Sequence, residues 1–122
     1  MVDSNDSTMA ALRAMSNPKR MTILRWLRDP TAHFPPQRDG DLVDDGVCVG
    51  FITQKIGLSQ PSVTEHMQVL AAAQLVTSKK CGNWMFYKLD ETKVASFLSA
   101  LQDSIGQPET TETVNSTQDA LI

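Results

Sequence analysis

The sequence lacks several features that would place the protein outside the cell or in a membrane. It has no apolar run approaching the ~18 residues that a membrane span requires. Its first ten residues (MVDSNDSTMA) are acidic and polar, whereas a secretory signal has a basic start and an apolar centre. Two cysteines in 122 residues are too few for a disulfide framework. We therefore expect a cytoplasmic protein without a membrane partner.

The usual marks of an enzyme active site are also missing. No carboxylate pair, nucleophile–base set or glycine-rich phosphate loop stands out, and neither Gly50-Phe51 nor Gly82-Asn83 matches a phosphate-binding signature. The length corresponds to one domain, whose 41% apolar residues suffice for one core but not for a large cleft with its own lid. We predict neither catalysis nor a resident cofactor.

An excess of basic residues is missing as well, because 14 acidic residues outnumber 11 basic ones. The charge is uneven, however. Residues 11–28 hold five basic and no acidic side chains, whereas residues 29–50 hold five aspartates and one arginine. Affinity for phosphates depends on local positive charge. The composition therefore permits binding to a polyanion, but predicts that it is modest and strongly sensitive to salt.

The most informative segment present is residues 55–89, KIGLSQPSVTEHMQVLAAAQLVTSKKCGNWMFYKL. Gly57 indicates a turn. Ser59 provides a hydroxyl N-cap for a helix over residues 60–73, and Pro61 stands in its first turn, where a missing N–H is harmless. Three apolar residues at helical spacing predict the buried face of this helix: Val63, Met67 and Leu70.

A β-hairpin is predicted directly after this helix. Residues 75–81 and 84–89 are apolar-rich segments joined by Gly82-Asn83, a two-residue hairpin signal. Apolar periodicity and N-caps predict four further helices, over residues 7–16, 18–28, 49–56 and 91–104. The predicted fold class is therefore mainly α with a two-stranded β-hairpin wing: a winged helix-turn-helix with five helices.

The segments outside these elements differ in composition. Residues 29–47 contain prolines, glycines and aspartates and are predicted to form a long inserted acidic loop within a domain of residues 7–105. Residues 1–6 are expected to be a flexible N-terminus. Residues 106–122, rich in Thr, Ser, Glu and Gln, are expected to be a disordered tail.

Four phrases together resemble the ArsR-type family of bacterial winged-helix repressors, namely NPKRMTILRWL, LSQPSVTEHMQVL, the LV that follows, and a wing ending in GNWMFYKL. The resemblance covers about residues 12–105. It implies a sequence-specific repressor of transcription that acts as a homodimer built from the first and last helices. Such a dimer would place two recognition helices in successive major grooves, roughly 34 Å apart, on double-stranded DNA with a pseudo-palindromic operator.

The outward polar side chains of this region are the candidate DNA contacts. Glu65 stands where many family members carry a basic residue, so it indicates either a preference for the cytosine amine or a solvated side chain. His66 suits core packing or a phosphate better than a metal. The wing lysines either contact phosphates or promote solubility. The candidates are Ser59, Gln60, Ser62, Thr64, Glu65, His66 and Gln68 on the helix and Lys79, Lys80 and Asn83 on the wing.

An apolar stripe on the last helix agrees with the implied dimer. One short helix carries five large apolar side chains, which need more apolar surface to pack against than a small domain offers. Alternatively, the helix packs only on its own domain. The predicted dimer residues are Met9 and Leu12 on the first helix and Val94, Phe97, Leu98, Leu101 and Ile105 at the other end.

The family's familiar effector sites are not found in this sequence. Its Cys-x-Cys pattern would align with Cys48-Val49-Gly50, where the second cysteine is absent, and residues 90–105 contain no histidine for the alternative site. The inserted loop supplies a weak candidate set of mixed nitrogen and oxygen ligands for a harder divalent ion. Aspartates in such loops are, however, usually turn formers. The weak metal candidates are His33, Asp41, Asp44, Asp45 and Cys48.

Other effectors leave weaker signals. A Cys48–Cys81 redox switch would need Cα atoms within ~7 Å, but the wing is expected to project away from the helix that follows Cys48. An organic effector could occupy an aromatic pocket, although core packing explains the same residues, Trp26, Phe34, Phe51 and Phe97. The sequence thus favours a DNA-binding repressor with an unknown effector. The alternatives are a winged-helix module that binds protein, or a repressor with a non-standard metal, redox or organic effector.

Overall fold

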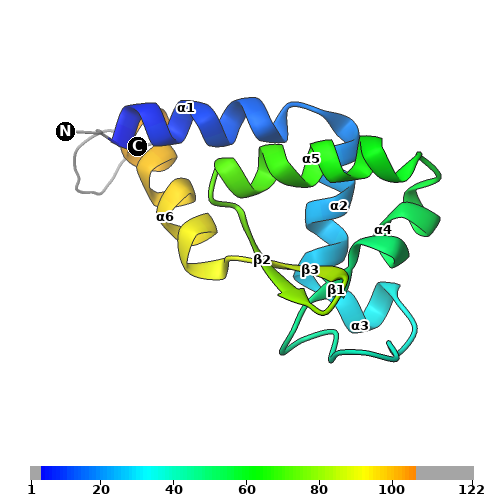
Figure 1. The fold of residues 1–122 in the computed structure, drawn as a ribbon. Coiled ribbons are helices and arrows are strands. Elements are labelled where there is room, and N and C mark those ends of the chain that lie inside the picture. Colours follow the sequence, from blue (N-terminus) through cyan, green and yellow to red (C-terminus); the bar gives the residue numbers. More distant parts are fainter. Residues whose placement is uncertain (1–3, 107–122) are drawn as a thin grey trace.

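The computed structural model describes residues 4–106, which fold around one core formed by helices and a small sheet (Figure 1). The order of the elements matches the expected winged helix-turn-helix, with additions. The elements are α1 (Ser4–Met15), α2 (Pro18–Arg28), α3 (Pro30–His33), β1 (Val47–Cys48), α4 (Val49–Ile56), α5 (Gln60–Ala72), β2 (Val76–Cys81), β3 (Trp84–Leu89), α6 (Glu91–Leu101) and a π-helical turn (Gln102–Gly106).

The predicted caps explain where three helices begin. Asn17 Oδ1 accepts the backbone N–H groups of Lys19 and Arg20, at 2.8 and 3.2 Å, at the start of α2. Ser59 Oγ accepts the N–H of Ser62 at 3.3 Å at the start of α5. Asp90 accepts at the start of α6 in the same way. These side chains satisfy N–H groups that have no partner inside a helix, so these three N-caps are confirmed. Ser7, the expected cap of the first helix, instead lies inside α1.

The core lies between α1, α2, α4, α5 and one side of the sheet. The predicted inward face of α5 is confirmed, because Val63, Met67 and Leu70 are all fully buried. They are joined in the core by Ile23 of α2 and Ile52 of α4, which are also fully buried. This packing fixes the orientation of α5, so its polar residues face outward.

The sheet has three strands in the order β1-β3-β2, which corrects the predicted two-stranded wing. Val47 and Cys48 pair with Tyr87 and Phe86 of β3, in antiparallel register. Gly46 makes this approach possible: its φ is +104°, and a Cβ there would lie 2.6 Å from the Tyr87 carbonyl oxygen. A two-residue strand has no detectable sequence period, so the pattern could not reveal it.

The predicted helices are also corrected in three respects. The loop predicted over residues 29–47 contains a short helix, α3, so the described residues hold six α-helices rather than five. The first helix already begins at Ser4, inside the N-terminus predicted to be flexible. The last α-helix ends at Leu101 and continues as a π-helical turn. The disordered tail was predicted over residues 106–122; Gly106 ends the π-helical turn, and residues 107–122 lie outside the described residues.

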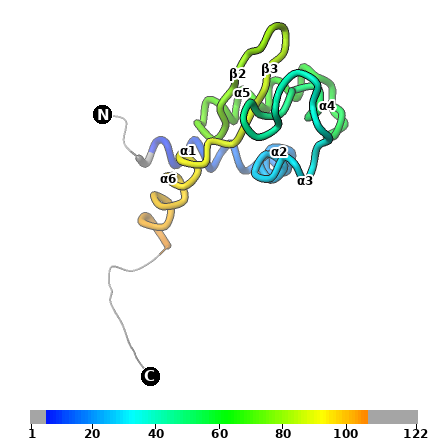
Figure 2. The backbone as a smooth tube through the Cα atoms, turned by 90° about the horizontal axis from the view of Figure 1, so that it is seen from below, coloured from blue at the N-terminus to red at the C-terminus, as the bar shows by residue number. Residues whose placement is uncertain are grey.

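Two groups of helices lie at opposite ends of the protein. In Figure 1, α6 packs against the N-terminal half of α1 at one end, whereas α3 and α4 lie at the other. Figure 2 shows α6 extending away from the body and the β2–β3 hairpin projecting from another side. None of the helices in residues 4–106 is long and apolar enough to cross a membrane.

Candidate nucleic-acid interface

The polar side chains predicted to read DNA share the outer side of α5. Four of the seven, Ser59, Gln60, Glu65 and Gln68, are exposed, and Ser62, Thr64 and His66 are half-buried. The turn before α5 is held by Gly57, whose φ of +77° suits glycine. The α4–turn–α5 unit therefore presents one continuous hydrogen-bonding face.

The two serines at the start of this face have different roles. Ser59 caps the helix, and its hydroxyl donates to Ser62 Oγ at 3.0 Å. Its hydrogen-bonding capacity is therefore partly used inside the protein. The hydroxyl hydrogen of Ser62 remains available for an acceptor such as a phosphate oxygen.

His66 is fixed by a residue of α2 that was not predicted as functional. Arg20 Nη1 lies 3.1 Å from His66 Nδ1, while Arg20 Nε donates to the Ala14 carbonyl at 2.6 Å. Arginine is always a donor, so His66 Nδ1 must accept and the proton of the neutral ring must lie on Nε2. Arg20 thereby sets His66 to offer an N–H donor through its other nitrogen.

Arg20→Gln should weaken DNA binding by about tenfold, because a hydrogen bond to a charged group contributes about 1.5–3 kcal/mol. The variant loses the fixed tautomer of His66 and the tie to the end of α1. The measurement is fluorescence anisotropy with a labelled duplex, beside urea unfolding of the free protein. Arg25→Gln is the control, since Arg25 is an exposed arginine of the same helix. Equal affinities for both variants would contradict a positioning role for Arg20.

On the wing, the predicted DNA contacts Lys79, Lys80 and Asn83 are all exposed, but one lysine already has a partner. Lys79 Nζ donates to Asp45 Oδ1 at 2.6 Å. This hydrogen bond lowers the pKa of Asp45 and raises the pKa of Lys79. Lys88 Nζ also donates to the Asp44 carbonyl at 3.1 Å. The acidic loop therefore holds the wing in place, and Asp45 would compete with a DNA phosphate for Lys79.

The same loop shows what its aspartates do. Asp41 Oδ2 accepts the N–H groups of Val43 and Asp44, at 3.0 and 2.8 Å, and Asp45 Oδ2 accepts the N–H of Asp41 at 2.8 Å. These carboxylates act as turn formers. Within residues 4–106, no three His, Cys, Asp or Glu side chains form a group that could hold a metal, so the weak set of His33, Asp41, Asp44, Asp45 and Cys48 does not come together.

Cys48 and Cys81 are both free thiols in one sheet. Cys48 pairs with Phe86 and Cys81 pairs with Trp84, on opposite sides of β3. Two strand spacings put their Cα atoms at least about 10 Å apart. A disulfide needs less than ~7 Å. The separation comes from the intervening strand, and not from the wing projecting away from Cys48 as the sequence suggested.

The aromatic residues predicted as a possible effector pocket pack on one another instead. Trp26 and Phe34 meet edge to face at 6.0 Å, and Phe34 stacks on Phe51 at 6.5 Å. Lys55 Nζ covers this cluster, 5.1 Å from the centre of the Trp26 ring. Phe97 is on α6 and takes no part in these ring contacts. These four residues therefore do not line one common pocket.

The predicted dimer residues divide into exposed and internal ones. Met9, Leu98 and Ile105 are 44%, 53% and 83% exposed. Leu12, Val94 and Leu101 are half-buried against the core. Phe97, only 8% exposed, belongs to the core of its own domain.

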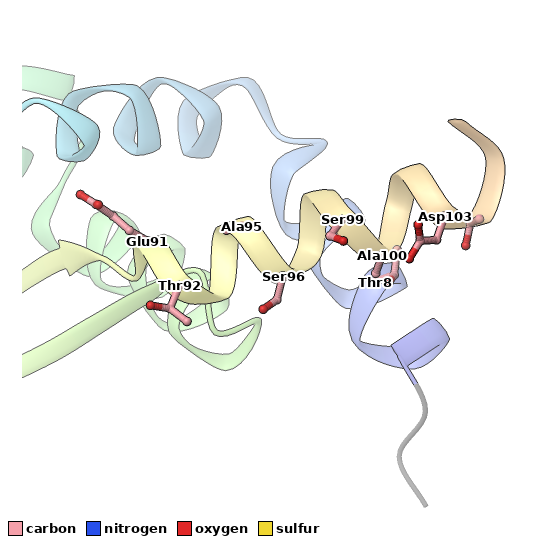
Figure 3. A pocket seen from close by; sticks show the side chains of 9 residues that line it. Thr8, Glu91, Thr92, Ala95, Ser96, Ser99, Ala100 and Asp103 are labelled. Atoms are coloured by element: carbon pink, nitrogen blue, oxygen red, sulfur yellow. The ribbon is translucent and has the colours of Figure 1, made fainter. Parts of the chain in front are cut away.

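Beside them, α6 forms one wall of an open groove of about 980 Å³ (Figure 3). Small side chains line most of it, and Thr8 of α1 lies beside Ala100 of α6. Ala95, Ser96 and Ser99 continue the line along α6. Because these side chains are short, another helix could approach the backbone of α6 closely here.

Comparison with individual known proteins identifies the family, whereas no protein-family model matches the chain. YbzH of Bacillus subtilis, which is named as an uncharacterized HTH-type transcriptional regulator, is 33% identical over 93 residues, which cover 76% of this chain and 93% of YbzH. ArsR2 of Halobacterium salinarum, which is named as an arsenical resistance operon repressor, is 32% identical over 107 residues, covering 88% and 78% of the two chains. The chain belongs to the ArsR family.

The fold supports this assignment. The structure of HlyU from Vibrio cholerae matches 88% of this ArsR-family chain and 100% of HlyU, with a TM-score of 0.58 and 25% identity. ArsR-family proteins are winged-helix transcriptional regulators that bind DNA. The chain is therefore a DNA-binding regulator of transcription and not an enzyme.

Proposed function

We propose that the protein is a homodimeric repressor that reads a pseudo-palindromic operator through α5 and the wing. The main support is the outward polar face of α5, where Arg20 orients His66 at 3.1 Å as an N–H donor. A major groove offers acceptors and donors on base edges that such side chains can distinguish. Since DNA is in the cytoplasm of a bacterial or archaeal cell, we expect the protein to act there.

The proposed contacts fall into two groups. Gln60, Ser62, Thr64, His66 and Gln68 would face the groove, with Glu65 accepting from the N4 amine of cytosine. Lys79, Lys80 and Asn83 would lie along the phosphates, which position the protein without reading sequence. Ser59 mainly maintains the helix start. Residues 51–90 contain four lysines and only two acidic side chains, so this part of the chain is locally basic.

The dimer is supported by the end of the protein that lies away from the wing. Leu98 and Ile105 expose large apolar side chains on the segment that extends from the body (Figure 2). Met9 of α1 is exposed as well. Burial of such residues in a two-fold interface removes apolar surface from water. To bind successive major grooves, such a dimer would hold its two α5 helices roughly 34 Å apart.

The test is selection of bound sequences from a pool of random duplexes at low salt, followed by anisotropy on the enriched sequence. The proposal expects a pseudo-palindromic motif bound by two chains, with affinity that falls steeply as salt rises. Binding that is equal for all duplexes, or absent at low salt, would overturn it and favour the module that binds protein. A promoter–reporter assay then separates repression from activation.

Asp45→Asn should strengthen operator binding by a few-fold, because it releases Lys79 for phosphate. The pKa of Asp45 is lowered, so the pair with Lys79 stabilises the fold above the ordinary carboxyl pKa of about 4 and is lost as pH falls through the lowered value. The gain in binding should therefore be constant between pH 6 and 8. Asp39→Asn, the same change at a carboxylate that does not contact Lys79, is the control. Equal gains in operator affinity in both variants would contradict the proposal that Asp45 holds Lys79 away from the phosphates.

A further inference from the structure

A second pocket, of about 350 Å³, lies between the acidic loop, the start of α4 and the wing. It contains none of the proposed DNA contacts. Its walls are formed by Cys48, Phe51, Trp84 and Phe86, with Arg38 and Gln54 also lining it. Its volume lies at the small end of the range for small-molecule sites, roughly 300–1,000 Å³.

The walls have the chemistry of a site for a flat ring. Two accessible aromatic side chains, Phe51 of α4 and Trp84 of β3, line one space beside a thiol, and Phe86 of β3, only 2% exposed, also lines it. Trp84 is 50% exposed although it is the largest apolar side chain of the wing. Aromatic rings stack on one another in offset or edge-to-face geometry. A planar aromatic ligand would cover Trp84 and fill the pocket.

The pocket is held open by the protein itself. Gln37 Nε2 donates to the Gly46 carbonyl at 2.9 Å, and Gln37 Oε1 accepts the Cys48 N–H at 2.6 Å. These bonds fix the loop to β1. Gly40 lies against Phe86, where a Cβ would meet the ring at 2.9 Å. A ligand would therefore bind without having to order the walls.

We propose that this pocket binds a planar aromatic molecule of one or two rings, which acts as the effector of the regulator. The effector role rests on the proposed function. Because the pocket joins the wing to the start of the helix-turn-helix, a ligand would bind best at one position of the wing relative to α5. By linkage, its affinity and the affinity for the operator then depend on each other.

Binding can be tested without DNA. The protein has two tryptophans, so ¹H–¹⁵N spectra show two indole signals, assigned with Trp26→Phe. The probes are 1-naphthol and its saturated analogue decahydro-1-naphthol, which differ in planarity. We expect 1-naphthol to shift the Trp84 signal saturably, with Kd of about 1 mM or tighter, and the saturated analogue not to do so. The Trp26 signal, outside the pocket, should move little.

Two further measurements localise the site. Bound 1-naphthol should slow alkylation of Cys48 by iodoacetamide. Gly50→Leu should abolish both effects, because a side chain there enters the pocket: its Cβ would lie 3.7 Å from Cys48 Sγ and meet nothing else within 4 Å. Equal shifts with both probes, or unchanged binding to a folded Gly50→Leu variant, would overturn the proposed site.

The effector role is tested separately on the selected operator. Saturating ligand should change operator affinity about fivefold or more in the parent protein and not in Gly50→Leu. Ligand binding with unchanged operator affinity would overturn the effector role. Failure to bind any operator would instead overturn the proposed function, and the ligand measurements would still decide the pocket.

Discussion

Simultaneous replacement of Ser62, Thr64 and His66 with alanine should lower operator affinity about 100-fold or more. Each good base contact contributes about 1–3 kcal/mol, and 1.4 kcal/mol is a factor of ten. The fold should survive, because the three side chains lie on the outer side of α5 and alanine favours helix. The measurement is anisotropy on the selected operator and on a scrambled duplex of equal length, with circular dichroism to check the fold.

The comparison between duplexes makes this prediction specific. Affinity for the scrambled duplex depends mainly on charge, so it should fall much less than affinity for the operator. Thr31→Ala, at an exposed residue of α3, should change neither. Operator affinity that survives the triple replacement would show that α5 does not read the sequence. The exposed polar face would then favour a surface that binds protein.

The parts of this site that could be predicted from sequence depend on neighbouring residues. Ser59 is a cap because its hydroxyl reaches an N–H three residues later, at 3.3 Å. Gly82-Asn83 joins β2 and β3 because a two-residue turn needs residues that accept positive φ, as Gly82 does at +62°. Such rules act over a few residues, so one sequence is enough to apply them.

The parts that were missed depend on residues far apart in the chain. Arg20 and His66 are separated by 46 positions, and Asp45 and Lys79 by 34. No local pattern distinguishes Arg20 from Arg25, although only Arg20 contacts the recognition helix. Likewise, the stripe on α6 gave no means of separating Phe97, which faces its own core, from Leu98, which faces outward. These contacts form only because the fold brings distant segments of the chain together.

If the proposed dimer forms through α6, Leu98→Glu should convert it into a monomer and lower operator affinity by about 100- to 1,000-fold. A dimer gains its second half-site at a high effective concentration, which is worth factors of about 10²–10⁴. A carboxylate at Leu98 would have to lose its water in the interface, which is strongly unfavourable. Because this side chain is 53% exposed in the single chain, the folded monomer should remain stable. Sedimentation equilibrium measures the oligomeric state.

A duplex with one half-site separates loss of the dimer from damage to α5. The monomeric variant should bind this short duplex as tightly as a single parent chain does, because the DNA-facing residues are unchanged. Val43→Glu adds the same charge at another exposed apolar residue, 56% exposed in the acidic loop, and should stay dimeric. A Leu98→Glu protein that remains a dimer would place the interface elsewhere than α6, and a monomeric parent protein would rule out the homodimer.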